Sequence, residues 1–241
     1  MSRFSEAPMN LWQGRIDDEE TTPALRWHQC IQPWQGESFS EGSARPIVLL
    51  GFACDEGVRR NKGRPGAADG PDAIRKALSN LSHDGKQTIF DGGTVCCEDQ
   101  QLEAAQRLLG EKVDEILQAG AHPLVLGGGH EVAWGSYQGL DHFLQSQHAA
   151  GPAKLGIINF DAHFDLRNPK STSSSGTPFR QIAESSRFAG KAFPYLVLGL
   201  NPASNTSALF DYARDQEVQW LNDLDCHWGR LDQNLQLIDA F

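Results

Sequence analysis

The chain has 241 residues, of which 39% are hydrophobic and 22% charged, and its formal net charge is −10 at pH 7. A chain of this length and composition can bury a substantial core in one large or two small globular domains. The acidic balance argues against nucleic acid or an anionic membrane as a partner. It still allows a small anionic substrate, which a few local arginines can hold.

The cysteines and the apolar runs of the sequence indicate in which cellular compartment the protein is expected. The five cysteines are scattered and odd in number, without a CxxC motif, which favours a reducing cytoplasm over a disulfide framework. The first residues lack the apolar stretch of an export signal, and no run approaches the length of a membrane span. We therefore expect a cytoplasmic protein without a membrane partner.

In chain order, residues 1–45 are predicted to form an irregular N-terminal wrap, and residues 46–241 a single α/β domain. Strands are predicted at residues 46–52, 88–90, 122–129, 154–160, 195–200 and 218–221. Helices are predicted at residues 71–81, 102–118, 131–146, 181–185 and 207–214, with another beginning at 234. Continuous apolar strands that alternate with helices predict a mostly parallel sheet covered on both faces, a three-layer α/β/α fold.

Polar clusters follow several of the predicted strands. They read GFACDEG, GGGHE, DAHFD and GLNPASN. Because parallel α/β sheets bind ligands at the carboxyl ends of their strands, these clusters mark the expected functional edge.

Two of the clusters together favour a metal site. Asp161, His163 and Asp165 alternate, so on an extended path they would share one face. His130 follows a neighbouring strand through three glycines, which let the backbone pass close to another group. Two imidazoles and two carboxylates suit a divalent cation, with the oxygen donors favouring Mn²⁺ over Zn²⁺. The alternatives are capping or solvated acids and a phosphate turn, but GxGxxG spacing is absent.

These motifs resemble the ureohydrolase superfamily, the arginase and agmatinase group of binuclear manganese hydrolases. GGGHE at 127–131, DAHFD at 161–165 and the glycine-rich residues 51–75 carry the resemblance. It implies two Mn²⁺ ions per complete subunit, which share a hydroxide that attacks an sp² carbon bonded to nitrogen. By this resemblance His130 and Asp165 hold one ion, His163 holds the other, and Asp161 bridges them. The metal-bound hydroxide is then the catalytic group, and no protein base is identifiable.

Within the superfamily, SSGTPF, DLR and LWQGR resemble the formimidoylglutamases, which convert N-formimidoyl-L-glutamate and water to L-glutamate and formamide in histidine degradation. Arginases carry a proton-shuttling histidine after the corresponding SSG, whereas Thr177 follows it here. A substrate with two carboxylates needs fixed cations or donors. Arg167 is the first candidate because arginine pairs with carboxylates in a bidentate way, and Ser174, Ser175 and Arg180 are weaker candidates.

The superfamily has a third motif, an Asp-x-Asp pair at a strand end. Asp223 and Asp225 follow their strand too early to supply it, so we expect it beyond Phe241, with the fold incomplete at the C-terminus. Two Mn²⁺ ions would be undercompensated by two aspartates, which is costly in a buried site. We therefore expect this chain alone to bind at most one ion weakly and to turn over little substrate.

Three alternatives remain open. One is an agmatinase or guanidinobutyrase, which would release urea. Another is a deacetylase-like enzyme with a single zinc, against which His130 offers a ligand for a second ion. The last is a catalytically inactive fragment that serves as an interaction module. Superfamily members are commonly trimers or hexamers, so a homo-oligomer is also expected.

Overall fold

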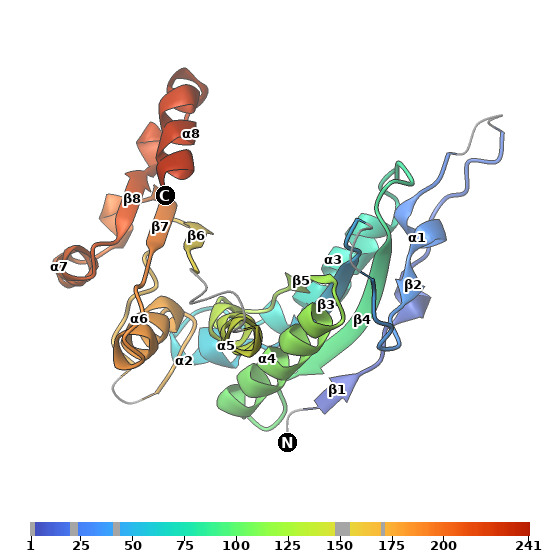
Figure 1. Cartoon of the computed structure of the whole chain (residues 1–241), viewed down its shortest axis with the longest axis horizontal. Helices are drawn as coiled ribbons and strands as arrows, with labels where there is room; N and C mark the ends of the chain where they lie inside the picture. Colours follow the sequence, from blue (N-terminus) through green and yellow to red (C-terminus); the bar gives the residue numbers. More distant parts are fainter. Residues whose placement is uncertain (1–2, 20–23, 41–43, 148–154, 170–171) are drawn as a thin grey trace. The chain divides into compact units, whose positions relative to one another are not determined.

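The computed structural model describes residues 3–19, 24–40, 44–147, 155–169 and 172–241. The chain divides into two compact units, Met1–Gln147 and His148–Phe241. Figure 1 labels the helices and strands of both units.

The first unit is built on a five-stranded sheet in which the path runs β1-β4-β3-β5, and β2 also pairs with β4. Its strands are β1 (Arg3–Ser5), β2 (Gln32–Pro33), β3 (Ile47–Ala53), β4 (Ile89–Cys96) and β5 (His122–Leu126). All pairs are parallel except the short β1–β4 pair. The helices are η1 (Met9–Leu11), α1 (Trp27–Cys30), α2 (Glu56–Arg60), η2 (Ala67–Asp69), α3 (Gly70–Ser79), α4 (Leu102–Gln118) and α5 (Val132–Ser146).

The central strand β3 is buried on both faces. Val48, Leu50 and Phe52 pack in one apolar cluster with residues of α4, which packs in turn against α5. Leu49 belongs to a second cluster that includes Trp12 and other residues of the N-terminal segment. Successive side chains of a strand point to opposite faces, so the unbroken run of apolar residues in β3 serves both clusters.

A buried ion pair lies on β4. The Arg75 guanidinium donates to both Asp91 carboxylate oxygens at 2.8 and 2.9 Å, and both side chains are fully buried. The Trp12 indole also donates to Asp91 at 2.8 Å. The sequence predicted only a short strand over residues 88–90 here. β4 instead continues to Cys96, since Arg75 compensates the charge that would otherwise end the strand.

The second unit has a three-stranded parallel sheet in the order β6-β7-β8. Its strands are β6 (Ile157–Phe160), β7 (Tyr195–Leu200) and β8 (Gln219–Asn222). The helices are α6 (Pro178–Phe188), η4 (Pro202–Ser204), α7 (Ser207–Asp215), η5 (Asp223–Asp225), η6 (Trp228–Arg230) and α8 (Leu231–Ala240). β7 is central and almost wholly buried, whereas β6 exposes 79% of Phe160.

The mostly parallel sheets confirm the predicted α/β class. The helix predicted over residues 102–118 is observed with those bounds, and the predicted strand over 195–200 is β7. The helix predicted over 181–185 is longer, because it begins at Pro178. The predicted boundary at residue 45 stays a prediction, although short strands and helices occur before it. The predicted start of the strand at Lys154 lies outside the described residues.

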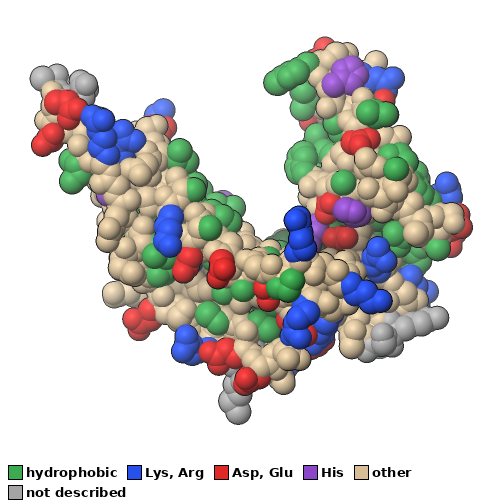
Figure 2. Space-filling view, turned by 180° about the vertical axis from the view of Figure 1, so that it is seen from behind, with side chains coloured by type: hydrophobic (Ala, Val, Ile, Leu, Met, Phe, Trp, Pro, Cys, Tyr) green, Lys and Arg blue, Asp and Glu red, His purple; other side chains and the backbone are tan. Residues whose placement is uncertain are grey.

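None of the helices in the described ranges has both the length and the apolar content needed to cross a bilayer. Acidic and basic side chains are interspersed on the surface seen in Figure 2. Arg59 and Arg60, which follow β3, both form ion pairs. The Arg60 guanidinium, for example, donates to Glu56 at 2.9 Å and to Glu103 at 2.5 Å.

Candidate metal centre

His130 stands at the end of a glycine turn between β5 and α5. The Gly128 amide donates to the Phe52 carbonyl at 2.9 Å, and the Gly129 amide donates to the Cys54 carbonyl at 2.8 Å. A Cβ atom on Gly128 would lie 2.0 Å from the Cys54 carbonyl oxygen. Only glycine fits against β3 there, so the turn places His130 two residues before α5.

Glu131, beside the histidine, is fully buried. Its carboxylate accepts from the Gly57 amide at 2.9 Å and from the Cys54 thiol at 3.5 Å. Burial raises the pKa of Glu131, and these hydrogen bonds oppose that shift. Glu131 was not among the predicted site residues, and an acidic residue at a helix start gives no signal that it will be buried. It joins the glycine turn to the start of α2.

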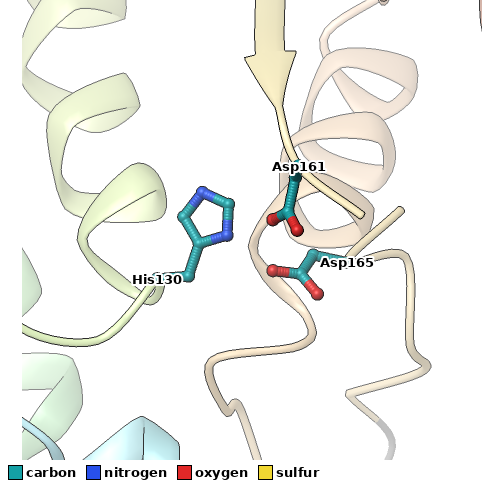
Figure 3. Close-up of side chains that lie close together, drawn as sticks. All are labelled: His130, Asp161 and Asp165. Carbon is teal, nitrogen blue, oxygen red and sulfur yellow. The ribbon is translucent and has the colours of Figure 1, made fainter. Parts of the chain in front are cut away.

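Asp161 and Asp165 come from one loop after β6, and Figure 3 shows their carboxylates side by side, with His130 labelled at the start of α5. One oxygen of Asp161 and one of Asp165 lie within 4.8 Å of each other. The expected strand alternation does not produce this arrangement, because β6 ends at Phe160. Asp165 instead has a left-handed backbone with φ of +47°, and this bend helps to set the direction of its side chain.

His163 is the exposed member of this loop, with 52% of its side chain accessible. Its Nδ1 lies 3.4 Å from an Asp161 carboxylate oxygen, and its backbone amide donates to the same oxygen at 3.0 Å. Two carboxylates and an imidazole within one short loop are donors of the kinds that Mn²⁺ accepts. The assignment of His130, Asp161, His163 and Asp165 as a joint ligand set stays a prediction.

The predicted substrate residues differ in their surroundings. Arg167 is exposed, and its backbone amide donates to the Gly176 carbonyl at 2.9 Å. Ser174 is buried, and its hydroxyl accepts from the Gly176 amide at 3.3 Å. Ser175 is half-buried. The Arg180 guanidinium donates to Glu184 at 3.0 Å and lies 4.0 Å from the Tyr212 ring centre, so it is already engaged.

Thr177, which stands where arginases carry a histidine, has a structural role here. Its hydroxyl accepts from the Ser174 amide at 2.9 Å, and it is 2% exposed. Phe179 stacks on Tyr195 with ring centres 4.5 Å apart. The segment therefore closes the serine loop onto α6.

Asp223 and Asp225, which we rejected as the third motif, make local contacts. Asp223 accepts from the Asn201 side chain at 2.8 Å, and Asp225 accepts from Arg230 at 2.5 Å.

Comparisons with known proteins extend this picture. The sequence profile of the arginase family matches residues 45–241. Formimidoylglutamase from Aeromonas hydrophila is 48% identical over 100% of this chain and 74% of its own length. The Chromobacterium violaceum formimidoylglutamase is also 48% identical, over 96% of this chain and 74% of its own.

Solved structures agree in fold. Trypanosoma cruzi formiminoglutamase with Mn²⁺ aligns with a TM-score of 0.66 and 32% identity, over 75% of this chain and 61% of that one. Bacillus subtilis formimidoylglutamase aligns with a TM-score of 0.70 over 94% of this chain and 69% of that one, and at 18% identity it supports the fold alone. The chain thus spans less than two thirds of the Trypanosoma cruzi protein. The predicted three-layer α/β/α fold is confirmed.

Proposed function

Because this chain belongs to the arginase family, we propose that it comes from a manganese-dependent hydrolase of C–N bonds in linear amidines. The proposed reaction converts N-formimidoyl-L-glutamate and water to L-glutamate and formamide. The observation that carries this proposal is 48% identity to a formimidoylglutamase over the whole chain. In this proposal the protein is a cytoplasmic enzyme of histidine degradation. It binds this small substrate and forms homo-oligomers.

The proposed metal ligands are His130, Asp161, His163 and Asp165, which would hold two Mn²⁺ ions together with the remaining ligands of a complete subunit. The donor chemistry supports this. Two ionised carboxylates within 4.8 Å repel one another unless a cation lies with them. Bound Mn²⁺ supplies Lewis-acid stabilisation and a strong nucleophile near neutral pH, which the weakly electrophilic amidine carbon requires.

The chain's own residues hold and orient the substrate in this proposal. Arg167 is the favoured clamp for a substrate carboxylate, because its side chain is exposed and a guanidinium can bind both carboxylate oxygens. Ser174 and Ser175 would offer hydroxyl donors. Arg180 is the weakest candidate, because substrate would have to displace its pairing with Glu184.

The test uses the protein that carries this chain, purified with Mn²⁺. It should release formamide from N-formimidoyl-L-glutamate and no urea from agmatine. Asp161→Asn and Asp165→Asn should each lower both Mn²⁺ content and turnover by at least about 10-fold, whereas the control Asp223→Asn should not. Urea release from agmatine without formamide release would contradict the proposed substrate.

The 241-residue chain should be measured in parallel. We expect it to bind at most one Mn²⁺ and to turn over little substrate. Activity equal to that of the protein that carries it would show that the ligand assignment is wrong.

A further inference from the structure

The loop that carries Asp161 and Asp165 has an unusual means of support. Two backbone hydrogen bonds to the segment of β7 continue past the end of β6. The Asp161 amide donates to the Leu198 carbonyl at 3.1 Å, and the Asn201 amide donates to the Ala162 carbonyl at 3.0 Å. After Ala162 the backbone reaches the left-handed turn at Asp165. Aspartate tolerates this backbone better than most residues other than glycine, but contacts from the surroundings are still needed to hold it.

Asn205, which follows β7 and η4, contacts this loop with its whole side-chain amide. Its oxygen accepts from the Phe164 backbone amide at 3.2 Å. Its nitrogen donates to the Ala162 and Asn201 carbonyls, both at 2.9 Å. Asn205 is only 9% exposed, so these bonds are shielded from water.

Tyr195 contacts the Phe164 carbonyl, whereas Asn205 contacts the Phe164 amide. Its hydroxyl donates to the Phe164 carbonyl at 3.0 Å and accepts from the Asn159 side chain at 3.1 Å. The Phe164 ring is fully buried and packs edge-on against Phe210 and Trp220. Side chains from other elements therefore fix the amide, the carbonyl and the ring of the residue just before Asp165.

We infer that Asn205 is a positioning residue for the metal loop, assisted by Tyr195, and that it keeps the Asp161 and Asp165 carboxylates together before any cation binds. The metal-binding part of this inference rests on the proposed function. A rigid loop places like charges side by side, as Figure 3 shows for the two carboxylates. A cation then binds without first having to order the loop, and this preorganisation increases affinity.

A merely structural role for Asn205 would predict a less stable protein with unchanged metal affinity. The two roles can be separated, because the unit offers a matched core control. Ile182 is 1% exposed on α6, and Ile182→Val removes one buried methyl group from an element outside the loop.

The experiment compares the unaltered chain with Asn205→Ala, Tyr195→Phe and Ile182→Val. Free Mn²⁺ is titrated by its electron paramagnetic resonance signal, and hydrogen exchange of the peptide that spans residues 160–168 is followed without metal. Asn205→Ala should weaken Mn²⁺ binding about 10-fold or more and speed exchange in this peptide. Tyr195→Phe should act in the same direction to a smaller extent. Ile182→Val should change neither.

Unchanged exchange in Asn205→Ala would overturn the clamp itself. Faster exchange with Mn²⁺ affinity within twofold of the unaltered chain would overturn the positioning role, as would an equal loss of affinity in Ile182→Val. If the unaltered chain takes up no Mn²⁺, the metal-positioning part of the inference is overturned for this chain and the clamp is judged by exchange alone, whereas the proposed function is judged separately by formamide release.

Discussion

The turn that carries His130 and the loop that carries Asp161 and Asp165 are held by different means. Backbone hydrogen bonds and a glycine pressed against β3 hold the turn. The loop has backbone hydrogen bonds at Asp161 and Ala162, but beyond them the side chains of Asn205 and Tyr195 hold the backbone of Phe164. An added atom should therefore destabilise the turn, whereas the removal of a side-chain group should destabilise the loop.

The largest effect should come from the buried ion pair in the unit that also contains the His130 turn. Arg75→Leu leaves the Asp91 carboxylate fully buried without its cation, and we expect a loss of about 3–5 kcal/mol in the free energy of unfolding. Urea denaturation measures this loss. Lys86→Ala, which breaks an exposed pair with Asp84 in the same unit, should change stability by less than about 1 kcal/mol. Equal effects would show that burial does not decide the cost.

Gly128→Ala tests the turn itself. Its added Cβ would lie 2.0 Å from a backbone oxygen, and we expect about 3 kcal/mol of destabilisation. The neighbouring Gly127→Ala is the control. The nearest atom to its Cβ, on Val132, lies 3.5 Å away, an ordinary contact, so its effect should stay within about 0.5 kcal/mol. Similar melting curves for the two variants would contradict the close approach to β3.

Thr177→Val probes a side-chain hydroxyl in the second unit. The substitution keeps the shape but leaves the Ser174 amide without its acceptor, which should cost about 1–2 kcal/mol. Thermal unfolding of this variant, compared with that of the exposed Thr172→Val, measures the difference. A loss no larger than that of the control would show that the serine loop does not need this hydroxyl.

The smallest effect concerns pH. Burial raises the pKa of Glu131 in the folded state, so the protonated carboxyl is favoured there. Below the unfolded pKa, near 4.3, both states are protonated. As pH rises from there through the folded pKa, the contribution of Glu131 to stability falls. Glu131→Gln should flatten this decline when unfolding free energies are compared between acidic and neutral pH. An unchanged slope would show that another group causes it.

The fold was predictable where pattern and environment agree. The helix over residues 102–118 follows from its apolar period, and β7 from its continuous apolar run. β4 was cut short at Phe90, because the partner that stabilises Asp91 lies sixteen residues away in the chain, at Arg75. No local pattern reveals such a partner.

The residue types of the candidate site could be predicted from the sequence, but the contacts that hold its loop in place could not. The motifs around His130 and Asp161 stand out in the sequence, and GLNPASN was predicted to lie at the functional edge. The role of Asn205 did not follow, because its bonds reach back about forty residues to Ala162 and Phe164. The bend at Asp165 also went unpredicted, since an alternating pattern indicates an extended path.

The left-handed backbone at Asp165 narrows the mutational tolerance of that position in two ways. Asparagine tolerates this conformation, so Asp165→Asn changes charge alone. Glutamate keeps the charge but adopts a positive φ less readily, and a β-branched residue would be a clear outlier there. When all residue types are tested at position 165, tolerance of a positive φ should therefore limit the active variants before the side-chain functional group does. Loss of activity in Asp165→Glu should not be attributed to the longer side chain alone.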